Sequence, residues 1–368
     1  MSEALHHSSL PEGPYKPVTA EDIRKLFKLG PLDKLGPTSQ KIINKILTWS
    51  FALNQANAII EQGHEFVDVE NMNAIYEALD IHPGEVDSDQ LKALIPPKGS
   101  PGAVVTTHHM GLADAVGAIL IGKLRPDMRA LGMNLMKVIN HNVDRFFIGV
   151  DSYGKTDKTD EDRANERQQI EDQVMEAFRL GEIVISLAAG TTARRRSIRE
   201  ILTEEVSDEP WKEGIFRYVM KWNEENPDNQ APIIPVLVEG ENSLLYQVVQ
   251  IISKHISRLL YLWQALNKNG SVYPVQIGEA IQPDELRALL EKFKLKYDDE
   301  NSEGDDLQRE KYAYKSLAQE VRERTYALAT KEIPLFRKLA RKCFDNKTIP
   351  NLLGKITKRG THYNKVSA

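Results

Sequence analysis

Two histidines and one aspartate are the residues of this chain best suited to chemistry. The stretch AVVTTHHMGLADA (103–115) is typical of a buried strand that runs into a loop with His108 and His109, and Asp114 follows at the start of a helix. The helix start folds back beside the loop, so the Asp114 carboxylate can accept a hydrogen bond from one imidazole nitrogen and leave the other free to take a proton. A histidine held in this way is a general base for activating a hydroxyl.

Three other interpretations of these residues stay open. Asp114 would be a helix N-cap, the histidines would form a surface pair, or they would be two metal ligands. A zinc site needs a third ligand, and the neighbouring sequence offers none. We therefore expect no metal, and a histidine base oriented by Asp114 stays open beside the helix N-cap and the surface pair.

A second motif, FIGVDSYGKT, matches the consensus sequence of a nucleotide-binding P-loop. Gly149, Gly154, Lys155 and Thr156 supply its G-x-x-x-x-G-K-T pattern. A working P-loop curls glycine-rich backbone around phosphate and enters a helix with an apolar face, whereas here Val-Asp-Ser-Tyr fills the loop and the acidic DKTDEDR follows. A P-loop site also needs a carboxylate at the end of a neighbouring strand to hold magnesium, and the candidate in the sequence is Glu239. The pattern therefore favours a loop that contacts a single phosphate through Lys155 over an ATPase or GTPase.

The elements that would position these residues fall into two parts. Residues 18–95 carry apolar side chains at three- and four-residue intervals, which predicts a small N-terminal helical bundle. From residue 96 apolar runs alternate with helical patterns, which predicts an α/β domain with a mixed central sheet flanked by helices. The predicted strands are AVVTT (103–107), FFIGV (146–150), EIVISLA (182–188), PIIPVLV (232–238) and YPVQIG (273–278), and the predicted helices of this domain span 113–124, 164–181 and 244–266.

Charge is distributed unevenly along the chain. Segment 331–368 has ten Lys and Arg residues against two acidic ones, so it carries +8 and leaves −13 for the rest of a chain whose net charge is −5. We expect a flexible N-terminus over 1–17, the α/β domain over 96–330, and a basic C-terminal helix and tail over 331–368. Such a tail can lie on an anionic membrane, or it can be a solvated terminal helix.

Composition narrows the class of protein further. The single cysteine, Cys343, rules out internal disulfides, and no apolar run reaches the roughly 18 residues of a membrane span. The start of the chain lacks the apolar centre of a secretion signal. We therefore expect a cytoplasmic protein, at most peripherally associated with a membrane, and no nucleic-acid partner.

The predicted helix over 244–266 has more apolar side chains than one helix face holds. Val248, Ile252 and Ile256 are among them. Such a helix is either part of the core or one wall of a groove for an apolar chain.

The wider pattern around the histidines resembles the first signature of the glycerolipid acyltransferases, the superfamily of glycerol-3-phosphate and lysophosphatidate acyltransferases. Its hallmark is a strand followed by His-x-x-x-x-Asp, which His109 and Asp114 match. Later pieces come in the family's order over about residues 96–285. These pieces are FFIGV, the Gly-centred basic turn AAGTTARRRS, the proline-interrupted strand APIIPVLV, and YPVQIGEAI.

Two stretches depart from the family's pattern. The third signature usually reads Phe-Pro-Glu-Gly-Thr-Arg-Ser, whereas residues 187–193 read LAAGTTA, and Val150 stands where the family has arginine. Plastid-type glycerol-3-phosphate acyltransferases also lack the glutamate, and they bind phosphate through a lysine after the second strand and arginines after the glycine turn. The residues in comparable places are Lys155, Arg194, Arg195 and Arg196.

The resemblance implies transfer of a fatty acyl group from a thioester of coenzyme A or acyl carrier protein to a hydroxyl of glycerol 3-phosphate. His109 would be the base, the four cations would bind the phosphate of the acceptor, and the thioester would be a co-substrate with no further cofactor. Two alternatives remain. The acceptor would be lysophosphatidate or another lysolipid, or the chain would be a catalytically silent lipid- or membrane-binding protein of the same fold.

Overall fold

The computed structural model describes residues 17–21, 37–50, 53–62, 68–86, 88–108, 110, 114–133, 143, 145–150, 159–190, 197–203, 208–252, 271–300 and 305–330. In this part of the chain, the helices that precede the sheet are α2 (Pro37–Ser50), α3 (Leu53–Gln62), α4 (Asp68–Ala78) and α5 (Ser88–Leu94). They fall within the N-terminal region that was predicted to be helical.

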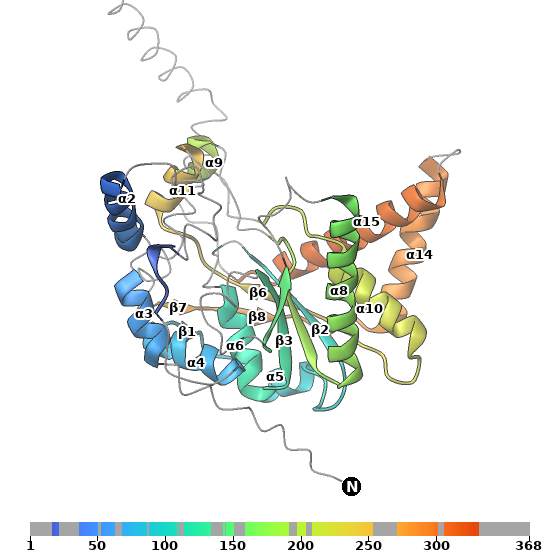
Figure 1. Cartoon of the computed structure of the whole chain (residues 1–368). Helices are drawn as coiled ribbons and strands as arrows, with labels where there is room; N and C mark the ends of the chain where they lie inside the picture. Colours follow the sequence, from blue (N-terminus) through green and yellow to red (C-terminus); the bar gives the residue numbers. More distant parts are fainter. Residues whose placement is uncertain are drawn as a thin grey trace, which may run out of the picture.

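A six-stranded sheet forms the centre of the protein (Figure 1). Its strand order is β4-β3-β5-β2-β6-β8, and all neighbours are parallel except β6 and β8. The sheet is therefore mixed, as predicted. The strands are β2 (Gly102–Thr106), β3 (Met128–Met133), β4 (Phe147–Val150), β5 (Ile183–Leu187), β6 (Ile233–Val238) and β8 (Val275–Ile277), and a separate short pair joins β1 (His82–Pro83) to β7 (Val272–Tyr273).

Strand β3 was not predicted from the sequence. Its residues, MRALGM, include several that favour helices, so local propensity gives no strand signal. The strand pairs with β4 on one side and β5 on the other, and this tertiary pairing overrides propensity. A Cβ at Gly132 would overlap the ring of Phe147, so glycine lets the neighbouring strand's aromatic ring lie across β3.

Helices cover both faces of the sheet (Figure 1). Helices α4 and α6 (Ala115–Leu124) pack on one face, and α8 (Asp160–Arg179), α10 (Gly214–Glu225), α14 (Pro283–Glu300) and α15 (Asp306–Tyr326) pack on the other. Successive strand residues point to opposite faces of the sheet. Val104 therefore packs in the core on the face covered by α4 and α6, whereas Ala103 and Val105 pack in the core on the other face. Burial on both faces explains why the strands read as continuous apolar runs.

Helices α14 and α15 lie along each other at one side of the molecule (Figure 1). The rings of Tyr297 and Tyr312 pack between them, with centroids 5.4 Å apart. Helix α15 also contacts β6, and Thr330, which follows α15, donates hydrogen bonds to Glu239, which follows β6.

Several predicted segments lie outside the described residues. They are residues 1–16 of the predicted flexible N-terminus, the basic segment 331–368, and residues 253–266 of the predicted apolar helix, of which α11 (Leu244–Ile252) is described. None of the helices in the described ranges combines the length and the apolar character that a membrane crossing requires.

Candidate active site

Two loops leave the sheet from neighbouring parallel strands, and together they mark the place where the fold favours a site. Strand β2 ends at Thr106 beside Leu187, the last residue of β5, so both loops begin at the same edge. The chain continues from β2 into α6 on one face and from β5 through α9 (Ile198–Thr203) to α10 on the other face. Open α/β sheets bind ligands in the crevice at such a switch point. We name the first connection, residues 107–114, the histidine loop, and the second, residues 187–190, the glycine turn.

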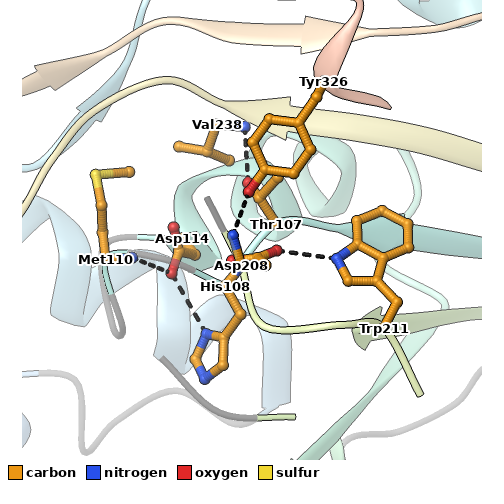
Figure 2. Close-up of polar contacts among 8 residues, drawn as sticks. All are labelled: Thr107, His108, Met110, Asp114, Asp208, Trp211, Val238 and Tyr326. Atoms are coloured by element: carbon orange, nitrogen blue, oxygen red, sulfur yellow. Dashed lines mark hydrogen bonds and ion pairs between the residues drawn. The ribbon is translucent and has the colours of Figure 1, made fainter. Parts of the chain in front are cut away.

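The carboxylate of Asp114 closes the histidine loop (Figure 2). Its Oδ2 accepts a hydrogen bond from the Met110 N–H at 2.8 Å and lies 3.3 Å from Nδ1 of His108. Asp114 is fully buried and His108 is 8% exposed. The imidazole contact has ion-pair distance but not the alignment of a hydrogen bond, and Oδ1 of Asp114 has no hydrogen-bond partner in the described part of the chain. Catalytic hydrogen bonds are often long in ligand-free proteins and tighten when substrate binds.

These positions bear on the alternatives for Asp114 and the histidines. Asp114 precedes α6, but its side chain makes no capping hydrogen bond and turns back to Met110 and His108 instead. His108 is buried and is therefore not part of a surface pair. Within the described ranges, no group of three or more His, Cys, Asp or Glu side chains is placed to hold a metal ion.

Two tyrosines lie near enough to Asp114 to be influenced by its charge. Burial, followed by the negative charge of Asp114, raises the pKa of Tyr76. Burial also raises the pKa of Tyr273, and Asp114 adds to that shift. These phenols therefore remain neutral at physiological pH, and neither ring adds a negative charge near Asp114.

A second buried carboxylate contacts His108 through the backbone. Both oxygens of Asp208 lie 2.9 Å from the His108 nitrogen and accept its N–H. Asp208 follows α9 in the sequence EEVSDEPW, one hundred residues after His108, and no motif marks it there. Only the folded chain brings the two together.

No protein-family model and no curated protein matches this chain. The chemistry of the site must therefore be inferred from its own residues and from the way the fold places them.

The glycine turn begins beside the end of β2. Gly190 has a φ of +64°, and its N–H donates to the Leu187 carbonyl at 2.8 Å, which closes the turn. The Ala188 N–H donates to the Thr106 carbonyl at 3.3 Å, and the Ala188 carbonyl accepts from the Lys212 N–H at 2.8 Å. Lys212 is exposed and its side chain passes beside Gly190. Sequence reasoning did not single out this lysine because no motif includes it.

Replacing Gly190 with alanine is expected to destabilise the protein by about 1–2 kcal/mol, the cost of a left-handed backbone for a residue with a Cβ. The added Cβ itself has room, because its nearest neighbour would be Cγ of Lys212 at 3.7 Å. Urea unfolding measures the effect. The matched control is Gly214→Ala at the start of α10, where the Cβ also has room and φ is not positive; equal effects of the two changes would contradict the backbone explanation.

The remaining predicted site residues fall largely outside the described residues. This holds for the predicted base His109, for Lys155, Arg194, Arg195 and Arg196, and for Ile256. Val248 is half-buried on α11, and Ile252 is the last residue of that helix. Their predicted roles in binding phosphate or an acyl chain therefore stay predictions.

The helix after the P-loop-like motif is poorly suited to a nucleotide. In α8 the N-terminal backbone groups are met by a capping box between Thr159 and Asp162, and Asp160, Glu161 and Asp162 place three acidic side chains in the first turn. A P-loop helix instead offers free N–H groups to phosphate. Glu239, the carboxylate considered for magnesium, is buried and accepts through Oε1 from the backbone and the hydroxyl of Thr330, at 3.1 and 2.7 Å.

Proposed function

We propose that this chain is an O-acyltransferase that moves a fatty acyl group from a thioester of coenzyme A or acyl carrier protein to a hydroxyl of glycerol 3-phosphate. The observation that carries the proposal is a buried imidazole–carboxylate pair, His108 and Asp114, at the carboxyl end of a central strand. A pair of this kind suits the removal of a proton from a hydroxyl.

The step follows from the chemistry of the two groups. A histidine of the loop takes the proton of the acceptor hydroxyl at its outer ring nitrogen, while Asp114 stabilises the imidazolium that forms. The oxygen attacks the carbonyl carbon of the thioester, a C–O bond forms and the C–S bond breaks. The departing sulfur takes the proton from the imidazolium, so the products are an ester and a free thiol.

Two neighbouring histidines compete for the role of base. The spacing of the sequence motif favours His109, and the observed contact of Nδ1 with Asp114 favours His108. We give the role to His108 because its ring is the one that lies beside the carboxylate in the described part of the chain. Separate replacement of the two residues decides between them.

The location of the pair favours a phosphorylated acceptor. The histidine loop and the glycine turn begin at the carboxyl ends of neighbouring strands, where ligands of α/β sheets bind, and Lys212 lies beside the turn. We propose that Lys155, which follows β4 in the sequence, and Arg194, Arg195 and Arg196, which follow β5, supply the remaining cations for the phosphate. Val248, Ile252 and Ile256 would line the groove for the acyl chain.

We also propose that helices α2 to α5 form a small bundle ahead of the catalytic domain, and that the basic segment 331–368 contacts anionic membrane from the cytoplasmic side. Ten basic residues against two acidic ones give this segment the charge for that contact. A lipid product would then form close to the bilayer that receives it.

A parallel assay tests the proposed reaction. Glycerol 3-phosphate and lysophosphatidate are each supplied with labelled acyl coenzyme A and with labelled acyl carrier protein, and the lipid formed is identified. We expect a labelled monoacyl glycerol phosphate from the first acceptor. Acylation of lysophosphatidate alone would move the proposal to the lysolipid alternative, and thiol release from neither acceptor would favour a silent lipid-binding protein.

A further inference from the structure

The carboxylate of Asp208 is the centre of a buried hydrogen-bond network behind the histidine loop (Figure 2). Asp208 is 4% exposed, and both its oxygens accept from the His108 N–H at 2.9 Å. Its Oδ2 also accepts from Nε1 of Trp211 at 3.0 Å. An ionised acceptor makes stronger hydrogen bonds than a neutral one, so this carboxylate fixes the backbone of His108 firmly.

The backbone of Asp208 is in turn fixed by the last turns of α15. Its N–H donates to the Tyr326 hydroxyl at 2.8 Å, and its carbonyl accepts from Nη2 of Arg322 at 2.8 Å. The Arg322 guanidinium also lies over the Tyr326 ring, 5.1 Å from its centroid. Burial, followed by the charge of Asp208, raises the pKa of Tyr326, so its hydroxyl stays neutral at physiological pH and adds no second negative charge beside Asp208.

His108 is therefore positioned by two carboxylates, one at its backbone and one at its ring. Asp208 holds the backbone nitrogen, and Asp114 faces the ring nitrogen at 3.3 Å. The ring contact is not aligned as a hydrogen bond, so a small movement of the backbone decides whether it closes or opens. Misplacement of a catalytic group by about 1 Å can lower a rate about 10²-fold.

We propose that Asp208 is the positioning residue of His108, and that through Asp208 the last turns of α15 set the contact between the His108 ring and Asp114. Asp208 touches neither substrate nor the transferred proton. The effect of Asp208 on the geometry of the His108 ring does not depend on which reaction the protein catalyses. Its effect on the rate rests on the proposed function.

Nitrogen-15 NMR of protein with labelled histidine tests the geometry directly, because the ring signals show which nitrogen carries the proton. The His108 signals are assigned by their loss in His108→Gln. In the unaltered protein we expect protonation at Nδ1, the atom that faces Asp114. In Asp208→Ala we expect a shift towards protonation at Nε2, and a fall in kcat of about 10²-fold with little change in KM.

A conservative variant and a control separate positioning from stability. Asp208→Asn keeps one oxygen that can accept the His108 N–H, so its ring signals and kcat should lie between those of Asp208→Ala and the unaltered protein. Asp305→Ala removes the N-cap carboxylate from the other end of α15, where it accepts from the Gln308 N–H at 2.7 Å, and should leave the His108 signals unchanged.

Each outcome decides the proposal. His108 ring signals and kcat that are unchanged in Asp208→Ala would overturn it. Should that variant fail to fold, Tyr326→Phe takes its place, since it removes only the hydroxyl that accepts from the Asp208 N–H; unchanged His108 signals in both Tyr326→Phe and Asp208→Asn would be equally decisive against it. A shift of the ring signals in a protein that acylates neither acceptor would support Asp208 as the positioning residue and reject the proposed reaction.

Discussion

Replacing His108 with alanine is expected to lower kcat for acyl transfer about 10²- to 10⁴-fold, the usual contribution of a general base. This loss corresponds to about 3–5 kcal/mol of transition-state stabilisation. In the proposed reaction the imidazole beside Asp114 removes the proton from the acceptor, and alanine leaves no base in its place. KM for glycerol 3-phosphate should change little, because the proposal assigns binding of the phosphate to cations and not to the histidine. Initial rates of thiol release from acyl coenzyme A measure both constants.

His82 offers a matched control for this change. Its Nε2 lies 2.7 Å from Oδ1 of Asp80, so it too forms a histidine–aspartate pair, but both side chains are substantially exposed and lie outside the switch point. His82→Ala should leave kcat unchanged. His109→Ala is the informative comparison. A large loss in His109→Ala with none in His108→Ala would return the role of base to His109, and full rates in both variants would exclude a histidine of this loop as the base.

The buried strands could be predicted because the sheet is covered on both faces. Continuous apolar runs such as Ile233–Val238 are uncommon outside such sheets, so sequence alone located β2, β4, β5, β6 and β8. Strand β3 escaped because its order comes from its two neighbours and not from its residues. Helix α10 was overlooked although Ile215, Phe216, Val219 and Met220 have helical spacing, so its signal was present in the sequence.

The site could be predicted only as far as local spacing reaches. A strand, a loop and a helix start bring Asp114 back to His108, and this short-range geometry needs no knowledge of the rest of the fold. Spacing cannot decide which of two adjacent rings turns towards the carboxylate, because a loop has no fixed period. Asp208 lies beyond any such reasoning, since it is one hundred residues from His108 in the sequence and its backbone is held by side chains of α15.

One buried arginine contacts the backbone at the amino ends of three strands, at the end of the sheet opposite to the candidate site. Arg125 follows α6, is 4% exposed, and donates to the carbonyls of Pro96, Pro97 and Ser100, the last two at 2.7 and 3.4 Å. It also donates to the Gly181 carbonyl at 2.8 Å and to both carboxylate oxygens of Asp127 at 2.8 Å. These partners precede β2, β3 and β5, so a single side chain ties together the amino ends of three strands.

Arg125→Met is therefore expected to lower the free energy of unfolding by about 3–5 kcal/mol, the usual cost when one partner of a buried charged network is removed. Methionine replaces the aliphatic stem, so the loss comes from the unmet carbonyls and from the Asp127 carboxylate and not from a cavity. Urea unfolding measures the change, and kcat of the folded fraction should stay unaltered because the switch point lies at the other edge. Arg179→Met is the control: its ion pair with Glu176 at 2.6 Å is exposed at the end of α8, two residues before Gly181, so stability should not change measurably. Of these two arginines, only Arg125 donates to the carbonyls that precede the strands. Similar unfolding midpoints for the two variants would therefore show that these hydrogen bonds do not stabilise the protein.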